Sequence, residues 1–451
     1  MRKLLFTLSI AIVCGIICSS CKDANRKPNE TESAFHTGHN IDDLSVFFDS
    51  ISSQFMGSVM ITQGDSVIFS KNTGFIDIEN KVPITDTTPF RIGSITKSFT
   101  GILTLKTIEA GKISMDDKLS KFFPDANITN ADSITIYHLL HHRSGLQDFV
   151  NETYQEFQSY MHEPQTKEQM LERFGKLKSN FPVGQKFSYS NTGYILLAYI
   201  LEQVNAKSYA EQIQEEIAQP LGLTGTFCSS GQSTNTNSYE YKEGWVKREP
   251  WHPSVCVGTG SIVSTTQDLQ KYIYAIANGF WGEYVTSQML DFVEGYGCGV
   301  GGIKGEDGKL IITHTGSLER YLAYMNYEDG TVTTLLQNTM ETKIETLIWT
   351  MNCAQKGEEF PIPDLNYIAL DSAQINEYIG EFTCENHKLT FSNNGKHLIA
   401  TDENNFSVTL NAKPNGAFQF YGYDIEIYFN QTKDSLKYRI GPENRMYTKV
   451  K

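Results

Sequence analysis

The first residues that could do chemistry are Ser94 and Lys97, which open a helical pattern directly after Phe90-Arg-Ile-Gly93. Residues three apart on a helix share a face, so Lys97 can bring its amine to the Ser94 hydroxyl. A serine needs an adjacent base to become a nucleophile, and a desolvated lysine of depressed pKa can serve. The helix N-terminus adds free backbone N–H groups at the reacting atom. This pair predicts a serine nucleophile with a lysine base.

A second candidate group is Tyr189-Ser190-Asn191. A phenol near an ammonium can be held partly deprotonated and can shuttle a proton to a leaving group. In an extended segment, Asn191 points to the same side as Tyr189 and can bind a substrate amide. This group therefore predicts that Tyr189 carries protons and that Asn191 binds a polar group of the substrate.

A third candidate group, His314-Thr315-Gly316, closes a β-type run that begins at Leu310. The glycine would let a substrate lie along the strand edge, and the next backbone N–H, that of Ser317, could complete an oxyanion hole. Each of the three motifs has a false match elsewhere, at residues 19–22, 324–326, 428–430 and 36–38. No motif therefore identifies a function by itself.

Together and in this order, the motifs resemble the serine β-lactamase and penicillin-binding protein superfamily, particularly its class C and D-alanyl-D-alanine carboxypeptidase-like branch. Segments 90–97, 136–146 and 258–265 are similar to family segments as well, and the resemblance covers residues 41–356. It implies that Ser94 is the acylated nucleophile and Lys97 its activator. It also implies that Tyr189 acts as general base and acid, while Asn191 orients the substrate and Lys97.

His314 stands where β-lactamases usually have lysine. A lysine is charged near neutral pH and attracts the carboxylate of a β-lactam, whereas a histidine is mostly neutral there. This favours an esterase, amidase or peptidase over a dedicated β-lactamase. The resemblance implies that His314 supplies electrophilic or charge support to the reaction. It also assigns substrate and oxyanion contacts to Thr315, Gly316, Ser317 and the N–H of Ser94.

The elements that must hold these residues follow an α+β pattern. A helical pattern at 41–54 precedes a β-hairpin over 57–70. Helical patterns follow at 94–110, 135–142, 194–204, 208–218 and 266–277, strands return at 310–313, 321–327 and 331–337, and a closing helix is expected at 341–355. This order predicts an antiparallel sheet flanked by helices, with a helical subdomain between its two halves. From residue 378, about eight short strands predict a small antiparallel barrel or sandwich, of which we expect the barrel. The resemblance implies that it is lipocalin-like. We expect the hydrolase over 41–360 and the barrel over 365–451.

Residues 1–20 have the charged, apolar and small-residue layout of a signal peptide. Cys21 follows directly and resembles the lipidated cysteine of bacterial lipoproteins. Cys18 stands where leucine is usual, so plain secretion remains open, and an uncleaved membrane anchor is a further alternative. Residues 21–40 are polar and predict a flexible tether. We expect a protein of the bacterial cell envelope, lipid-anchored on the periplasmic or outer surface, or secreted.

Composition excludes some functions. Lys and Arg number 38 against 52 Asp and Glu, giving a formal net charge of −14, which argues against nucleic acid as a partner. The expected partner is a small-molecule or peptide substrate, peptidoglycan-derived peptides included. We expect contact with the membrane only through a lipid anchor. No cofactor and no metal are expected, and the sequence leaves the oligomeric state open. The five cysteines after Cys21 are scattered and predict unpaired thiols.

Three alternatives accompany this interpretation. His138, His141 and His142 have helical spacing that could suit a metal, but no zinc-protease glutamate accompanies them, so we expect a structural role. Trp245, Trp251 and His252 lie in a polar stretch that could rim a pocket or simply pack. A catalytically silent penicillin-binding sensor or scaffold is the alternative function. The intact motifs favour the enzyme.

Overall fold

The computed structural model describes residues 36–151, 154–229, 237–242, 244–305, 308–363, 365–385, 387–404, 407–420, 425–440 and 443–450. These residues divide into two compact units. Unit 1 comprises Ser52–Met340, and unit 2 combines residues 36–51 with residues 341–450. The predicted signal peptide and Cys21 lie outside the described residues. The domain boundary near 360–365 stays a prediction.

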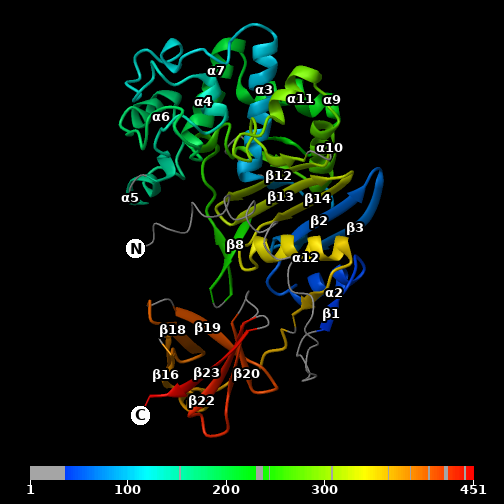
Figure 1. The fold of residues 1–451 in the computed structure, drawn as a ribbon, viewed down its shortest axis with the longest axis vertical. Helices are drawn as coiled ribbons and strands as arrows, with labels where there is room; N and C mark the ends of the chain where they lie inside the picture. Colours follow the sequence, from blue (N-terminus) through cyan, green and yellow to red (C-terminus); the bar gives the residue numbers. More distant parts are fainter. Residues whose placement is uncertain are drawn as a thin grey trace. The chain divides into compact units, whose positions relative to one another are not determined.

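The core of unit 1 is a six-stranded antiparallel sheet (Figure 1) with the strand order β11-β12-β13-β14-β2-β3. Its strands are β2 (Gly57–Gln63), β3 (Ser66–Thr73), β11 (Gly301–Lys304), β12 (Leu310–Leu318), β13 (Tyr321–Glu328) and β14 (Thr331–Gln337). Two distant segments of the chain meet where β14 pairs with β2. The sheet thus draws on both ends of the unit, as the sequence pattern predicts.

Strand β12 is longer than predicted and carries the His314 motif inside the sheet. It pairs with β13 from Ile311 opposite Glu328 to Leu318 opposite Tyr321. The apolar run alone ends at residue 313, but the backbone pairing continues, because Gly316 and its neighbours need no apolar side chain to form the ladder. His314 therefore stands on a rigid strand.

Helices form the remaining layer and the helical subdomain of unit 1. They are α3 (Thr96–Glu109), α4 (Ile136–Leu140), α5 (Tyr154–Gln158), α6 (Lys167–Phe174), α7 (Asn191–Asn205), α8 (Tyr209–Ile213), α9 (Gln219–Leu221), α10 (Thr266–Ala277) and α11 (Glu283–Met289). α10 packs on β13, β14 and β2, and α3 packs against α7 and α11. α3 is buried on nearly its whole circumference from Thr96 to Leu105, which makes it a rigid support.

Short strands complete unit 1. They are β4 (Phe75–Asp77), β5 (Val82–Pro83), β6 (Phe90–Arg91), β7 (Phe227–Cys228), β8 (Ser238–Tyr241), β9 (Trp245–Arg248) and β10 (Ile262–Ser264). β10 pairs with both β6 and β7 and so fixes the segment that leads into the Ser94 motif.

Unit 2 contains a closed antiparallel barrel of eight strands, in agreement with the predicted small β-barrel. The strands are β16 (Gly380–Cys384), β17 (His387–Asn393), β18 (Leu398–Asp402), β19 (Ser407–Ala412), β20 (Ala417–Phe420), β21 (Ile425–Phe429), β22 (Ser435–Ile440) and β23 (Glu443–Lys449). Phe382, Phe391 and Phe418 fill its interior together with aliphatic side chains. The α+β fold class followed by a barrel is confirmed.

The rest of unit 2 comprises α2 (Asp43–Ser50), α12 (Ile344–Lys356), α13 (Ser372–Asn376), β1 (His36–Gly38) and β15 (Phe360–Ile362). α12 packs against α2, and β1 pairs with β15. The expectation of a flexible tether through residue 40 is therefore wrong for residues 36–38, because their backbone is held in this strand pair.

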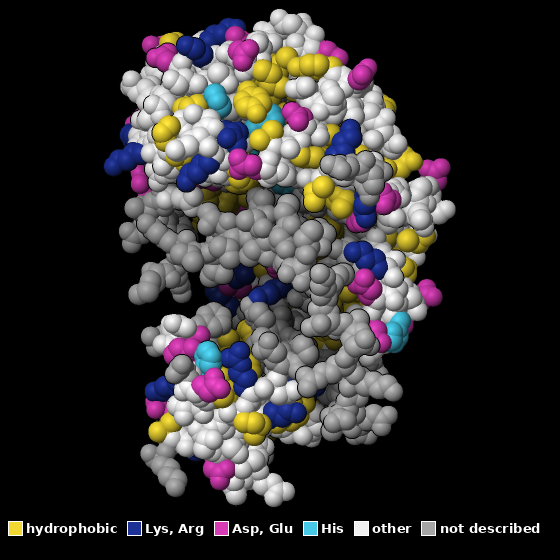
Figure 2. Space-filling model, viewed as in Figure 1, with side chains coloured by type: hydrophobic (Ala, Val, Ile, Leu, Met, Phe, Trp, Pro, Cys, Tyr) yellow, Lys and Arg dark blue, Asp and Glu magenta, His cyan; other side chains and the backbone are white. Residues whose placement is uncertain are grey.

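The surface in Figure 2 mixes acidic, basic and apolar side chains, with the acidic ones scattered rather than gathered in one patch. The negative net charge therefore does not mark a binding face in this view. Within the part of the chain that is described, no helix has the length and apolar character needed to cross a membrane.

Candidate active site

Ser94 and Lys97 lie side by side at the beginning of α3. A 3-10 turn (Gly93–Ile95) carries Ser94, and Lys97 follows in the first turn of the α-helix. Lys97 Nζ lies 3.2 Å from Ser94 Oγ. Ser94 is half-buried, whereas the Lys97 side chain has no exposed surface. The pair has the proximity that the sequence predicts for a nucleophile and its base.

Lys97 is buried and, among the described residues, has no carboxylate in direct contact. Its Nζ donates a 2.7 Å hydrogen bond to Asn191 Oδ1, and its other close polar partner is the Ser94 hydroxyl. Burial lowers the pKa of Lys97 to about 7, although the nearby Asp148 charge opposes the shift. A large fraction of Lys97 is therefore a neutral amine near neutral pH, which is the form that can accept the Ser94 proton.

Asp148, which the sequence analysis did not single out, fixes the orientation of Asn191. Its Oδ2 accepts hydrogen bonds from Asn191 N (3.2 Å) and from Asn191 Nδ2 (2.8 Å). With the amide nitrogen committed to Asp148, the amide oxygen must face Lys97. Burial raises the pKa of Asp148, while the Asn191 N–H groups and Lys97 oppose that shift. The only sign of Asp148 in the sequence is that it lies two residues after the family-like segment 136–146.

Tyr189 approaches Lys97 with its ring rather than its hydroxyl. The Lys97 Nζ lies 4.6 Å from the ring centroid, and Ser190 between Tyr189 and Asn191 is extended, as expected. Burial raises the pKa of Tyr189, and the neighbouring Ser94 hydroxyl opposes this only in part. The expectation that Tyr189 is held partly deprotonated is therefore not met. The phenol remains protonated near neutral pH and suits a donor better than a base.

His314 is buried beside this group and is held neutral. Its Nδ1 lies 2.6 Å from the Thr315 carbonyl oxygen, so Nδ1 carries the proton, and its Nε2 lies 3.3 Å from Tyr296 Oη. Burial and the charge of Lys97 lower the pKa of His314 to about 4. The expected electrophilic or charge support does not fit this arrangement, because the one imidazole N–H is already donated to the backbone.

The edge of β12 that faces away from β13 lies next to the turn that carries Ser94. The β12–β13 hairpin closes at Leu318 opposite Tyr321, so Leu318 and Gly316 face β13 with their backbone groups. Ser317 lies between these two positions, and its N–H points to the other edge of β12. β11 pairs with β12 only as far as Thr313, so it does not cover that edge at Ser317.

Two glycines bring the backbone of this edge against the turn that carries Ser94. A Cβ on Gly316 would lie 3.2 Å from Ser94 N and 1.9 Å from the Ile92 carbonyl oxygen, and a Cβ on Gly93 would lie 2.7 Å from Ser317 N. Gly93 also has a φ of +49°, which favours glycine. The backbone N–H groups of Ser94 and Ser317 are thus close neighbours, as an oxyanion hole requires.

The three histidines near α4 do not converge on a common point. His138 Nδ1 lies by Thr135 and His141 Nδ1 by the Tyr137 carbonyl, while His142 Nδ1 accepts from Ser190 N at 3.1 Å. The described residues hold no group of three or more His, Cys, Asp or Glu side chains that could bind a metal ion. His142 instead supports the backbone between Tyr189 and Asn191, a role that the sequence analysis missed.

The tryptophans differ in their relation to the site. Trp251 is half-buried, packs edge-on against Phe157 and donates its backbone N–H to Glu319, which follows Ser317 by two residues. His252 binds Ser254 at 2.8 Å. Trp245 packs on Tyr241 within the β8–β9 hairpin. The Trp251 segment is thus tied to the end of β12 through Glu319, and the β8–β9 hairpin is tied to the same turn through the ion pair of Glu240 with Arg320.

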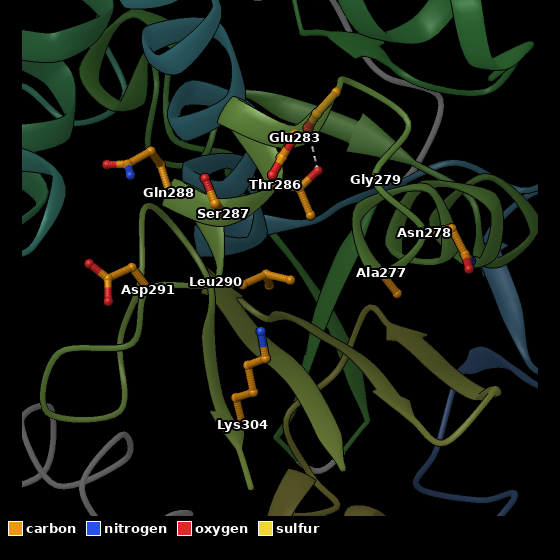
Figure 3. Close-up of a pocket in the computed structure, with 11 residues that line it drawn as sticks. Ala277, Asn278, Gly279, Glu283, Thr286, Ser287, Gln288, Leu290, Asp291 and Lys304 are labelled. Carbon is orange, nitrogen blue, oxygen red and sulfur yellow. Dashed lines mark hydrogen bonds between the residues drawn. The ribbon is translucent and has the colours of Figure 1, made fainter. Parts of the chain in front are cut away.

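The hollow in Figure 3 is a separate feature. It has a volume of about 670 Å³ and lies beside α10 and α11, with Lys304 of β11 pointing toward it. Its lining includes Glu283, Ser287 and Asp291, and none of the predicted catalytic residues belongs to it. Chemistry is better placed at Ser94, where a buried amine and a hydroxyl meet.

Comparison with known proteins decides the family. The Beta-lactamase family model matches residues 48–350, most of the chain. The chain belongs to the Beta-lactamase family. This Beta-lactamase family member is 24% identical over 423 residues to Penicillin-binding protein 4* of Bacillus subtilis (strain 168), covering 85% of this chain and 92% of that protein. It is 28% identical over 227 residues to Protein flp of Staphylococcus aureus (strain N315), covering 48% of this chain and 44% of that protein.

Solved structures agree on the fold of this Beta-lactamase family member. The octameric penicillin-binding protein homologue from Pyrococcus abyssi has a TM-score of 0.60 at 22% identity, covering 90% of this chain and 99% of that chain. The D-amino acid amidase from Ochrobactrum anthropi SV3, complexed with L-phenylalanine amide, has a TM-score of 0.56 at 24% identity, covering 65% of this chain and 89% of that chain. At these identities the likeness supports the fold alone.

Proposed function

We propose that this chain is a serine hydrolase that acts on peptide, amide or ester substrates through an acyl-enzyme at Ser94. The observation that carries the proposal is the buried Lys97 amine, 3.2 Å from Ser94 Oγ and with its pKa lowered to about 7. A buried lysine held against neutral oxygens is poorly suited to stabilising the fold but well suited to accepting a proton.

The reaction runs in two steps. Ser94 Oγ attacks the substrate carbonyl carbon and gives its proton to Lys97, while the N–H groups of Ser94 and Ser317 hold the developing oxyanion. The bond to the leaving group breaks, the Tyr189 hydroxyl protonates that group, and Lys97 returns a proton to Tyr189. Water then hydrolyses the acyl-enzyme by the reverse sequence of proton transfers. Asn191 and Asp148 keep Lys97 in place throughout.

We propose a D-alanyl-D-alanine carboxypeptidase or esterase in preference to a dedicated β-lactamase. With its pKa lowered to about 4, His314 offers no positive charge near neutral pH to hold the carboxylate of a β-lactam. The names of similar proteins, penicillin-binding protein and D-amino acid amidase, suit this substrate range. Nitrocefin turnover approaching that of a dedicated β-lactamase would contradict this preference.

The test is intact mass after incubation with a serine-reactive phosphonate or with penicillin. The wild type should gain one adduct, Ser94→Ala should gain none, and the control Ser287→Ala should behave as wild type. Ser287 is an exposed serine of the hollow in Figure 3, so the control also tests that hollow. A wild type without an adduct would favour the alternative of a silent penicillin-binding sensor or scaffold.

For location, we propose a lipoprotein of the bacterial cell envelope anchored through Cys21. The support is the layout of residues 1–21 in the sequence. Cys21→Ala should move the protein from the membrane fraction to the soluble fraction. A variant that stays in the membrane fraction would contradict lipidation at Cys21.

A further inference from the structure

We propose that Arg91 and Glu319 form a positioning pair that holds the two N–H donors of the oxyanion hole in register, an inference that rests on the proposed function. Arg91 Nη1 and Glu319 Oε1 form an ion pair, and the two side chains are 2% and 4% exposed. Arg91 belongs to β6, and Glu319 follows the end of β12. The pair therefore joins two segments that are far apart in the sequence.

Each partner lies close in sequence to one oxyanion donor. Arg91 precedes Ser94 by three residues, and Glu319 follows Ser317 by two. Next to the two donors, Gly93 and Gly316 bring the two backbones into contact. A displacement of β12 along or away from the Ser94 turn would therefore have to stretch the ion pair. An oxyanion hole needs donors held near 3 Å from one point, so small displacements matter.

The backbone of Glu319 is strained at this point. It has a φ of +56°, and it is the first of two residues in the turn between Leu318 and Tyr321. Arg320 is not among the residues with positive φ, which matches a type II′ turn, where glycine is preferred at the first position. A glycine would relieve the strain but would remove the carboxylate that binds Arg91 and the Trp251 N–H.

Stability alone does not account for the pair. Among the described residues, Glu319 Oε2 and the Arg91 Nε and Nη2 atoms make no hydrogen bond. Burial also raises the pKa of Glu319, although the Arg91 charge opposes the shift. A buried ion pair with unmet polar atoms contributes little net stability compared with apolar side chains of similar volume. A strained turn and a buried pair at the same place point to positioning.

The test removes both charges together in Arg91→Met/Glu319→Gly, so that no buried charge is left alone and the turn receives its preferred residue. The probes are p-nitrophenyl butyrate for turnover and phenylboronic acid, which binds Ser94 and places a tetrahedral oxygen in the oxyanion hole. We expect kcat to fall about 10- to 100-fold with KM changed less than about 3-fold, because a misplaced donor acts on the transition state. Phenylboronic acid affinity should fall by a similar factor, while the thermal midpoint stays equal or rises.

Matched variants keep the proposal falsifiable. Arg91→Lys retains the charge but shortens the reach, and it should show an intermediate loss of kcat and boronate affinity at a wild-type thermal midpoint. Lys309→Met/Glu328→Gln removes an ion pair (2.6 Å) near the opposite end of the β12–β13 hairpin. This control should leave kcat and the affinity for phenylboronic acid unchanged.

The outcomes distinguish this inference from the proposed function. Wild-type kcat and boronate affinity in both Arg91 variants would overturn the positioning role, provided that the wild type acquires a phosphonate adduct at Ser94. A wild type without that adduct would instead contradict the proposed function on which the inference rests.

Discussion

Each of the two units buries a lysine, and the two lysines have different surroundings. Lys97 in unit 1 has no exposed surface and donates to the neutral oxygens of Ser94 and Asn191. Lys413 in unit 2 is 1% exposed, and its Nζ lies 3.9 Å from Oε1 of the fully buried Glu426. Arg439 lies 3.8 Å from the other oxygen of the same carboxylate.

The difference shows how one residue type serves two purposes. Glu426 compensates the charge of Lys413 directly, which is the arrangement of a structural ion pair. Asp148 binds Asn191 and acts on Lys97 by its charge from a distance, so the buried ammonium is undercompensated and loses its proton readily. We therefore assign catalysis to Lys97 and structural support to Lys413, and replacing each by methionine should have opposite effects on activity and stability.

Lys97→Met should have the largest effect on activity. We expect kcat/KM for p-nitrophenyl butyrate to fall by about 10³-fold or more, because Ser94 loses its base. The thermal midpoint should not fall, since the substitution removes an undercompensated buried amine. The folded-state pKa of about 7 lies below the ordinary 10.5, so the unfolded chain binds more protons between these values, and wild-type stability should rise with pH there. That rise should weaken in Lys97→Met.

Lys413→Met should show the opposite response. It leaves Glu426 buried with less compensation, so the free energy of unfolding should fall by about 3–5 kcal/mol, as measured by chemical denaturation. Turnover per folded molecule should match wild type. A loss of stability in Lys97→Met together with none in Lys413→Met would reverse the assignment.

Asp148→Asn should sharpen the contrast by removing the nearby negative charge that acts on Lys97. We expect a loss in kcat/KM of about 10- to 100-fold, because a neutral amide accepts the Asn191 N–H groups more weakly than a carboxylate and orients Asn191 less firmly. Since the Asp148 charge raises the pKa of Lys97, the acidic limb of the pH profile should also move to lower pH. An unchanged limb would mean that Asp148 does not act on Lys97.

His314→Gln should have the smallest effect on the pH profile. The acidic limb of kcat/KM near pH 7 could be attributed to an ordinary histidine, but burial and Lys97 lower the pKa of His314 to about 4. The limb should therefore remain near pH 7 in the variant, while the rate changes by about 10-fold at most. Loss of the limb would assign it to His314.

The sequence was sufficient for the parts of the site that depend on local spacing. Ser94 and Lys97 share a helical turn, and an extended Ser190 links Tyr189 to Asn191, so short-range geometry predicts both pairs. The alternating strands after residue 378 likewise predict a small barrel or sandwich, and the family resemblance favours the barrel. The barrel interior and the sheet follow from apolar patterning.

The residues that sequence reasoning missed depend on tertiary contacts. Asp148 and Tyr296 come from segments without periodicity, and His142 lies in the turn after α4, and each acts by contacting a motif residue that is distant in the sequence. The protonation states could not be predicted either, because they depend on which side chains are buried. The pKa shifts of Tyr189 and His314 arise from desolvation, which no spacing reveals.

The central claim is that Lys97 activates Ser94 as a neutral amine. The most direct measurement is the second-order rate constant of Ser94 phosphonylation as a function of pH, with the adduct located at Ser94 by peptide mass. The rate should rise with pH and reach half its plateau near pH 7. A rate independent of pH from 5 to 9, or a midpoint near the ordinary lysine value of 10.5, would contradict it.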